Sequence, residues 1–295
     1  MSGARITQRL MVERSLSSLQ LGFGRLSSSQ EKLSTGRNIN RPSDSPTGTN
    51  DAMRLRAELA ANAQYTRNAD DGLSWLGHAD ATFTSMLDGV RRARDLMVEG
   101  ASTGSGSVDA REAIAQELTQ IRSGLLDEAN AQHLGRPLFG GTTAGSIAYD
   151  GSGQYVGDGN AVNRTVGDGI TVSVTVTGPA AFAAGTDDLF TVLSDVIDQL
   201  RTNPSALGSS LNRIDAVTTT MRTAQAAVGT RVNRIESARE ALASSALSNT
   251  QSLSDVENVD SAAAIVDLQM QEVAYKAALG ATGRVLQPTL LDFLR

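Results

Sequence analysis

Apolar residues near the N-terminus recur at steps of four and three, the spacing of the contact line of a coiled coil. This line consists of Val12, Leu16, Leu19, Phe23, Leu26 and Leu33. Thr35-Gly36 follows, and a glycine here can adopt the left-handed conformation that ends helices. The pattern predicts a first helix that runs to about Ser34.

A second apolar line of the same spacing lies in the C-terminal part of the chain and is too long for a chance run. It consists of Leu211, Ile214, Met221, Val228, Val232, Ile235, Leu242, Ala246, Leu253 and Val256. The other positions are mainly Ser, Arg, Gln, Glu and Asn, so the line is narrow. A narrow line suits helix-on-helix contact better than burial in a broad core. We expect one long helix after Asn203-Pro204.

A polar segment, 37–46, separates the first helix from a second one. Pro42 and Pro46 forbid an uninterrupted helix through this segment. Ser45 is placed to cap the second helix, with Pro46 at its first position, and we expect this helix to reach about Gly100. Its apolar line consists of Leu76, Phe83, Met86, Val90 and Met97.

The middle of the chain changes character twice. Residues 103–107 predict a turn, and Val108 to about Gln132 predicts a third helix, which makes a helical hairpin. From Gly135 glycines recur, and over 170–177 valine and isoleucine alternate with threonine and serine, which is strand periodicity. Two or three short strands are expected, too few for a large sheet domain. The helical pattern resumes at Asp187.

The predicted fold is mainly α. It is an elongated antiparallel helical bundle or coiled coil formed by the N- and C-terminal segments, with a small β-rich insert in the middle. Three domains are expected. They are a terminal coiled coil of residues 1–45 and 250–295, a helical bundle of 46–136 and 187–249, and a β-rich insert of 137–186.

Composition and charge narrow the classes of function. Only 4% of the residues are aromatic and Trp75 is the single tryptophan, which fits a slender helical bundle. The net charge of −6 argues against a nucleic-acid-binding protein, because phosphate contacts need a basic surface. Residues 1–45 carry a formal +4, whereas residues 251–295 carry −3. The two ends are therefore expected to attract each other or oppositely charged neighbours.

Other features bear on the compartment. The chain has no cysteine, so it can form neither a disulfide nor a thiolate metal site. Its first fifteen residues contain Glu13 and many polar residues, and they lack the apolar core of a secretory signal. The longest uncharged stretch, 169–186, is broken by Gly178-Pro179, so we expect no membrane span and a soluble chain.

Four motifs carry a resemblance to a known family. The stretch Leu33-Ser-Thr-Gly-Arg-Asn-Ile-Asn-Arg-Pro-Ser-Asp-Ser-Pro46 resembles the hinge signature of the bacterial flagellin superfamily, and its Asn-Arg-Pro-Ser-Asp portion is similar to the hook-associated protein 3 branch. Pro137-Leu-Phe-Gly-Gly-Thr142, Tyr155-Val-Gly-Asp158 and the closing Leu286-Gln-Pro-Thr-Leu-Leu-Asp-Phe-Leu-Arg295 agree with that branch. The likeness spans the chain in order.

The resemblance implies a structural protein that joins the flagellar hook to the filament. It implies terminal segments that are disordered in the free monomer and fold when subunits stack into the inner tube of the flagellum. It also implies export by the flagellar type III apparatus, an extracellular flagellar location, and a chaperone at the C-terminal helix. The implied partners are a larger hook-associated protein, flagellin and further copies of the chain in a ring.

On this resemblance, two sets of residues are expected to act in assembly. The subunit contacts are assigned to Val12, Leu16, Leu19, Phe23, Leu26, Leu33, Val266, Val273, Leu286, Leu290, Leu291, Phe293 and Leu294. The hinge is assigned to Asn40, Arg41, Pro42, Ser43, Asp44 and Pro46.

No catalytic, cofactor or metal site is expected, and we expect the chain not to be an enzyme. Lys32 and Lys276, the only lysines, do not follow a glycine as a Walker loop requires. His78 and His133 lack metal-ligand spacing and are interpreted as helix-face histidines. The stretch 150–161 resembles a calcium loop but has Tyr155 and Ala161 where glycine and glutamate belong, so it is interpreted as β-turns, with weak cation binding as a remote option.

Two alternatives stay open at this stage. A minimal flagellin, which forms the filament itself, shares the nested plan, but the Arg41-Pro42-Ser43 hinge and the small insert count against it. An unrelated coiled-coil signalling or adhesion protein would reproduce the heptad lines but gives no reason for the hinge or the C-terminal motif.

Overall fold

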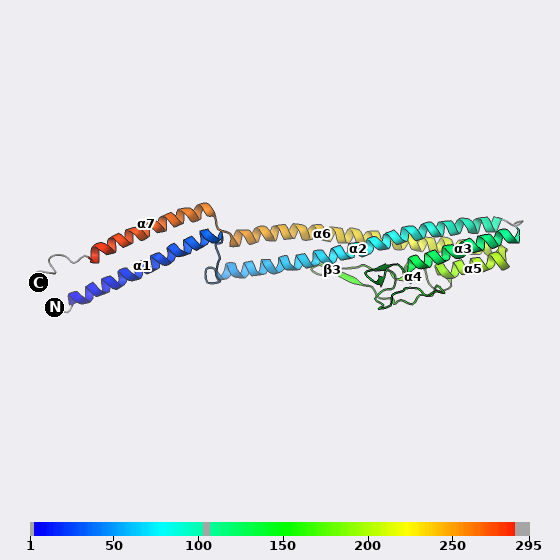
Figure 1. The fold of residues 1–295 in the computed structure, drawn as a ribbon, viewed down its shortest axis with the longest axis horizontal. Coiled ribbons are helices and arrows are strands. Elements are labelled where there is room, and N and C mark those ends of the chain that lie inside the picture. Colours follow the sequence, from blue (N-terminus) through cyan, green and yellow to red (C-terminus); the bar gives the residue numbers. More distant parts are fainter. Residues whose placement is uncertain (1–2, 103–106, 287–295) are drawn as a thin grey trace. The chain divides into compact units, whose positions relative to one another are not determined.

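The computed structural model describes residues 3–102 and 107–286 (Figure 1). By its internal contacts the chain divides into unit 1, residues 1–60 and 246–295, and unit 2, residues 61–245. The α-helices are α1 (Gly3–Thr35), α2 (Pro46–Ser102), α3 (Val108–Ala129), α4 (Gly178–Phe182), α5 (Leu189–Thr202), α6 (Leu207–Glu257) and α7 (Ser261–Leu286). The short elements are β1 (Gln132–His133), β2 (Arg136–Pro137), β3 (Asn163–Gly167), β4 (Ile170–Ser173), η1 (Gly185–Asp187) and η2 (Pro204–Ala206). The predicted fold class, mainly α with a small β-rich insert, is confirmed.

Unit 2 is a helical bundle whose core is built from the predicted apolar lines. The five residues of the α2 line are all fully buried, and in α6 Ile214, Met221, Val228 and Ile235 are fully buried too. Polar contacts fix the antiparallel register of α2 and α6, with Arg94 pairing with Asp215 at 2.6 Å. In unit 2 the heptad spacing therefore gives ordinary core burial.

The helices of unit 2 begin where capping side chains satisfy the free N–H groups of the first turn. Ser107 caps α3 by accepting a hydrogen bond from the backbone N–H of Ala110 at 3.2 Å. Asp188 caps α5 by accepting one from the N–H of Thr191 at 3.4 Å. α3 and α5 lie side by side in the bundle (Figure 1).

An aromatic cluster joins the insert to the bundle. Phe139 packs against Phe83 of α2 and Phe182 of α4, with ring centroids 5.3 and 4.8 Å away. Tyr149 packs against Phe190 of α5 at 5.0 Å. All five rings are at most 1% exposed, so the insert is anchored through aromatic contacts despite the low aromatic content.

The insert has more strands than the two or three expected. In the described residues β1 pairs with β2 and β3 with β4, both antiparallel, giving two separate two-stranded sheets. The predicted alternation over 170–177 forms a strand only to Ser173 and is broken at Thr175, which is buried. The Thr175 hydroxyl accepts a hydrogen bond from the N–H of Val162 at 2.9 Å, which satisfies the buried group.

In unit 1 α1 pairs with α7, and the expected single C-terminal helix is in fact two. α6 ends at Glu257 and α7 begins at Ser261, with residues 258–260 between them. Asp260 caps α7, its carboxylate accepting from the N–H of Ala262 at 2.9 Å and of Ala263 at 3.2 Å. The prediction of one helix was wrong because neither proline nor glycine marks this break, which a capping aspartate makes instead.

Candidate assembly interface

One face of α1 packs along one face of α7. The Ser29 hydroxyl donates a hydrogen bond to the Asp267 carboxylate at 2.7 Å. Gly22 lies close to the Tyr275 ring, because a Cβ added to this glycine would be 3.5 Å from the ring. These two approaches fix the antiparallel register. The half-buried positions again step by four and three along each helix. They are Ser15, Leu19, Gly22, Leu26, Ser29 and Leu33 on α1, and Ala264, Leu268, Gln271, Tyr275, Ala278 and Thr282 on α7. We call these two rows the inner seam.

The inner seam uses only half of the apolar line predicted on α1. Leu19, Leu26 and Leu33 lie in the seam and are half-buried. Leu16 and Phe23 lie beside it with 56% and 59% of their surface exposed, and Val12, which continues the spacing of the seam seven residues before Leu19, is 38% exposed. Phe23 touches Tyr275 at a ring distance of 6.1 Å but is mostly uncovered.

A second apolar row lies on α7, away from the inner seam. Val266, Met270 and Val273 are 57%, 63% and 67% exposed and, with Ala277, repeat the four-and-three spacing. α7 is therefore apolar on opposite sides, and a helix of this kind is normally surrounded by packing partners. We call Leu16 and Phe23 of α1 and Val266, Met270, Val273 and Ala277 of α7 the outer row.

The predicted contact residues thus fall into three groups. The described members of the predicted set lie along the inner seam or in the outer row, and they are Val12, Leu16, Leu19, Phe23, Leu26, Leu33, Val266 and Val273. Leu286 ends α7, and its side chain lies outside the described residues, as do Leu290, Leu291, Phe293 and Leu294. The prediction omitted Met270, although this residue stands between Val266 and Val273 in the same heptad spacing and could have been identified from it.

The predicted hinge forms a compact polar turn around Asp44. The Asp44 carboxylate accepts hydrogen bonds from the backbone N–H groups of Arg41 at 2.8 Å and Asn40 at 3.0 Å. These two bonds, that of Arg41 first, lower the pKa of Asp44 below its ordinary value. Pro42 and Ser43 are exposed at the tip of the turn. Pro46 is the first residue of α2, and Ser45 caps this helix by accepting from the N–H of Gly48 at 3.1 Å.

The hinge is bonded to the break between α6 and α7. The N–H of Asn38 donates to the carbonyl of Glu257 at 2.7 Å, and the N–H of Val259 donates to the carbonyl of Gly36 at 3.0 Å. Gly36 has a φ of 69°, which favours glycine at this crossing. Both segments of unit 1 therefore interrupt their helices at the same level, and backbone bonds hold the two interruptions together.

An ion pair lies beside this crossing, at the last residue of α6. Arg56 of α2 pairs with Glu257 at 2.7 Å, and the Glu257 side chain is only 12% exposed. A buried carboxylate needs such a partner, so Arg56 fixes the end of α6 against the start of α2.

The other chemistry-bearing residues have structural contacts. Asp150 accepts from the N–H groups of Ser152 and Gln154, each at 2.9 Å, as expected for a β-turn. Asp158 accepts from the N–H of Thr142 at 2.7 Å, so the two carboxylates of the calcium-like stretch serve different turns. His133 lies in β1 and not on a helix, because α3 ends at Ala129, earlier than predicted. Its buried ring lies 5.2 Å from Trp75 and 4.9 Å from His78.

Within residues 3–102 and 107–286 no group of three or more metal-ligating side chains is present. No helix in the part of the chain that the structure describes is long and apolar enough to cross a membrane.

Comparison with known proteins places this architecture. Residues 7–144 match the family model of the bacterial flagellin N-terminal helical region. The chain is 26% identical over 275 residues to flagellar hook-associated protein 3 of Escherichia coli (strain K12), which covers 84% of this chain and 86% of the relative. Polar flagellin F of Vibrio parahaemolyticus is 32% identical, but only over 39% of this chain and 31% of its own length. Over most of its length the chain is similar to flagellar hook-associated protein 3.

Solved structures agree with this relationship. A flagellar hook-associated protein from Vibrio parahaemolyticus superposes with a TM-score of 0.67 over 73% of this chain and all of its own, at 24% identity. The hook-associated protein-3 of Legionella pneumophila gives a TM-score of 0.63 over 69% of this chain and 98% of its own, at 13% identity. At these identities the likeness shows a shared fold, and the resemblance to the hook-associated protein 3 branch rests on the sequence match across most of both chains.

Proposed function

We propose that this chain is a structural protein of the bacterial flagellum that joins the hook to the filament. Its sequence matches hook-associated protein 3 over most of both chains, whereas polar flagellin F matches over 39% of this chain and 31% of its own length. This difference favours the junction over a minimal flagellin. The role is mechanical, and it needs neither a catalytic nor a cofactor site.

One observation carries the proposal: the uncovered outer row of unit 1. Among the side chains that the structure describes in α1 and α7, none is buried, yet both helices carry apolar residues at heptad spacing. Full burial of one Val, Leu, Phe or Met side chain stabilises by about 1.5–3 kcal/mol. If neighbouring subunits covered the outer row, each buried side chain would add this much free energy to the stability of the assembly. Such packing matters because most of the stability of a helix in a protein comes from tertiary contacts.

This arrangement suggests how the parts divide the work. Residues 1–45 and 250–295 would form the inner tube, with Leu286, Leu290, Leu291, Phe293 and Leu294 extending its contacts. Residues 46–136 and 187–249 would contact neighbouring subunits farther out, and residues 137–186 form the insert. A larger hook-associated protein would bind on the hook side, flagellin on the filament side, and further copies of the chain around the ring.

Two further parts of the proposal concern the hinge and export. The bonded crossing of residues 36–38 with 257–259 would hold the two helical segments in register as subunits stack, with Asn40, Arg41, Pro42, Ser43, Asp44 and Pro46 shaping the turn. We also propose that the chain is exported by the flagellar type III apparatus, with a chaperone on the apolar C-terminal helix.

Filament assembly distinguishes the junction protein from a flagellin. The purified protein is added to filament seeds, and to hooks together with the larger hook-associated protein and flagellin, and growth is followed by electron microscopy. We expect no filament from this protein alone, but flagellin growth on hooks only when it is present. Long filaments of this protein alone would overturn the junction role.

A pair of substitutions tests the outer row directly. Leu16→Asp combined with Val273→Asp places charges at two exposed apolar positions, so the monomer should keep its circular dichroism spectrum and melting temperature. Incorporation at the hook should fall by at least tenfold, because assembly would bury both charges. Ser18→Asp adds one such charge at an exposed polar position on the opposite side of α1 from Leu16 and should assemble normally. Normal assembly of the double variant would show that the outer row is not a contact surface.

A further inference from the structure

A cleft opens in unit 2 beside the N-terminus of α5. Its volume is about 360 Å³, and its walls come from the loop that carries Tyr149 and Tyr155, from Ala183 to Gly185, and from Asp188 and Thr191 at the start of α5. All of these residues belong to unit 2, and the assembly surface described above uses none of them.

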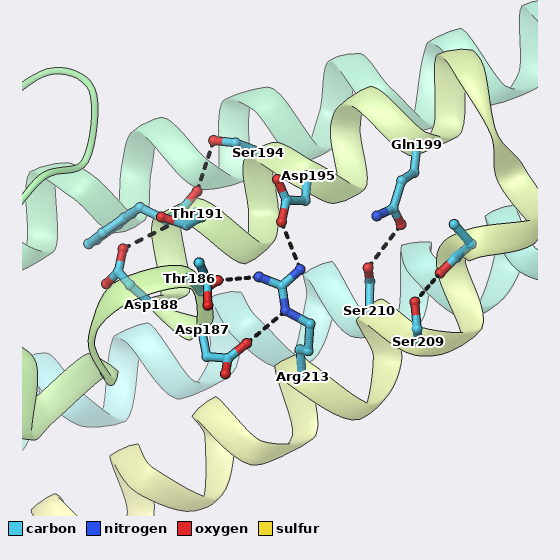
Figure 2. Close-up of polar contacts among 12 residues, drawn as sticks. Thr186, Asp187, Asp188, Thr191, Ser194, Asp195, Gln199, Ser209, Ser210 and Arg213 are labelled. Atoms are coloured by element: carbon cyan, nitrogen blue, oxygen red, sulfur yellow. Dashed lines mark hydrogen bonds and ion pairs between the residues drawn. The ribbon is translucent and has the colours of Figure 1, made fainter.

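Among the residues that the structure describes, two that line this cleft each have a buried polar atom without a hydrogen-bond partner. These atoms are the Tyr149 hydroxyl oxygen and one carboxylate oxygen of Asp188, Oδ1, and these residues are 1% and 7% exposed. The second Asp188 oxygen accepts from the N–H of Thr191 (Figure 2). Nearly all buried polar groups in folded proteins are bonded, so two unpaired groups that line one cleft point to a missing partner.

The nearby guanidinium groups are bonded elsewhere. Arg213 of α6 donates to the carboxylates of Asp187 at 2.9 Å and Asp195 at 2.7 Å, and to the carbonyl of Thr186 (Figure 2). Arg122 of α3 donates to the carbonyl of Phe190 at 3.2 Å and to that of Ser152. Within the described residues, Asp188 therefore has no ion pair, although it is a buried carboxylate.

The electrostatics of the cleft favour a cation. Burial raises the pKa of Asp188 to about 6, against the effect of the N–H groups at the start of α5 and of Arg122, so the group is ionised at neutral pH. Burial and the neighbouring Asp188 also raise the pKa of Tyr149, which keeps its hydroxyl neutral. Tyr155, the other titratable group here, has its hydroxyl bonded to the carbonyl of Phe139 at 3.2 Å. An anionic ligand would be repelled by the Asp188 carboxylate, which has no ion pair among the described residues.

The aromatic side chains that line the cleft restrict the class of possible ligands further. The rings of Tyr149 and Tyr155 lie 5.4 Å apart at an angle of 59°, and both line the cleft. A carboxylate beside aromatic rings is an environment that binds organic ammonium ions, through a charged hydrogen bond and cation–π attraction. A bare metal ion would need more oxygen ligands than Asp188 Oδ1 and one hydroxyl.

The backbone around the cleft is specialised too. Ala183 has a φ of 66° and a ψ of −176°, a conformation otherwise adopted almost only by glycine. A Cβ on Gly178 would lie 2.5 Å from the Tyr149 hydroxyl oxygen, so the ring depends on this glycine for its position. Strained residues of this kind persist where the surrounding structure holds them, often at ligand sites.

We propose that this cleft binds a primary ammonium group, which donates hydrogen bonds to Asp188 Oδ1 and to the Tyr149 hydroxyl oxygen. The group belongs either to a free small amine or to a lysine side chain of a neighbouring protein in the flagellum. Either source presents the same –NH₃⁺ on an alkyl chain, which the two tyrosine rings would cover.

Binding is measured on the full chain by NMR titration at pH 7.5. The probes are n-butylammonium, n-butanol as its neutral counterpart, and Nα-acetyl-lysine amide as the stand-in for a lysine side chain. We expect saturable shifts at amides near Asp188 with both ammonium probes and none with n-butanol. Tighter binding of the lysine derivative would indicate a protein source, and tighter binding of n-butylammonium a free amine.

Matched variants assign the effect to the cleft. Asp188→Asn removes the charge but keeps a helix-capping side chain, and it should weaken ammonium binding at least tenfold. Tyr149→Phe should weaken it severalfold. Asp187→Asn removes the neighbouring carboxylate, which faces Arg213, and should leave binding unchanged. In the wild type, affinity should rise with pH through about 6, where Asp188 ionises.

Three results would overturn the proposal. One is the absence of saturable binding by either ammonium probe, which would mean that ordered water alone fills the cleft. The second is equal binding of n-butanol and n-butylammonium. The third is unchanged affinity in Asp188→Asn when circular dichroism shows that the variant is folded.

Discussion

The bundle of unit 2 and the helix pair of unit 1 carry the same heptad spacing but use it differently. In unit 2 Phe83, Leu118 and Leu193 are fully buried, because several helices and the insert surround them. In the α1–α7 pair no seam residue that the structure describes is fully buried, and Leu16 and Val273 are 56% and 67% exposed. Two helices share a single seam, so any apolar residue outside it faces solvent until a further helix covers it. Heptad spacing therefore predicts a helical partner without showing whether this partner lies in the same chain.

The two regions also differ in what holds them. Unit 2 depends on apolar and aromatic packing. Unit 1 depends on the inner seam, on two backbone hydrogen bonds at the crossing and on the Arg56–Glu257 pair. A region with few buried apolar contacts opens at low free energy, so unit 1 should open at a lower free energy than the bundle.

The largest effect is expected from a truncation in the bundle core. Phe83→Ala removes a ring that packs against Phe139 and Phe182, and it should lower the free energy of unfolding by about 3–5 kcal/mol. Leu26→Ala, its counterpart in the inner seam, should lower it by about 1 kcal/mol, because this side chain is only half-buried. Urea denaturation followed by circular dichroism measures both. Equal losses would show that the pair is packed as firmly as the bundle.

Sequence patterns alone captured the bundle well. The apolar line of α2 is fully buried as its spacing predicts, and in α6 Ile214, Met221, Val228, Ile235 and Leu242 are buried, whereas Leu211, Val232, Ala246, Leu253 and Val256 are only partly buried. The division of the α1 line into inner seam and outer row was not predictable. Leu19 and Leu16 are equally apolar, and only the position of α7 decides which of them is covered.

A smaller effect on stability is expected from a change of pH, and it should be confined to unit 2. The pKa of Asp188 rises from an ordinary 3.8 to about 6 in the folded chain, so the folded state binds more protons than the unfolded state between these values. The stability that this group contributes is complete below pH 3.8 and is lost as the pH rises through 6, by at most about 3 kcal/mol.

Hydrogen exchange resolves this effect by unit. Amides in the core of unit 2 should lose protection between pH 4 and 6.5, after correction for intrinsic exchange rates, and this loss should disappear in Asp188→Asn. Asp187→Asn is the control, because that carboxylate is 66% exposed and paired with Arg213. A pH dependence that persisted in Asp188→Asn would assign the effect to another group.

Local chemistry that sequence patterns do not encode explains what was missed. The break at 258–260 depends on the Asp260 cap and on bonds to residues 36–38, which are distant in sequence. The burial of His133 follows from the end of α3 at Ala129 and from contact with Trp75, a tertiary arrangement. The cleft beside α5 joins Tyr149 to Asp188 across the insert, and neither residue stands in a recognisable motif.

The smallest expected effect lies in unit 1, where lowering the pH should reduce stability instead of increasing it. Asp44 has a lowered pKa because it accepts the N–H groups of Arg41 and Asn40, so its contribution is present above pH 3.8 and is lost as the pH falls through its folded pKa. Acid should therefore loosen the hinge at a pH where protonation of Asp188 favours the bundle. Exchange at the amides of Asn40 and Arg41, corrected for intrinsic rates, should accelerate below pH 4 in the wild type. In Asp44→Asn, whose amide oxygen still accepts these bonds but does not titrate, the corrected exchange should not depend on pH, whereas Asp51→Asn, on α2, should behave as wild type. If acid instead loosened both units together, they would form one cooperative structure, and the contrast between packed bundle and uncovered pair would not extend to their stability.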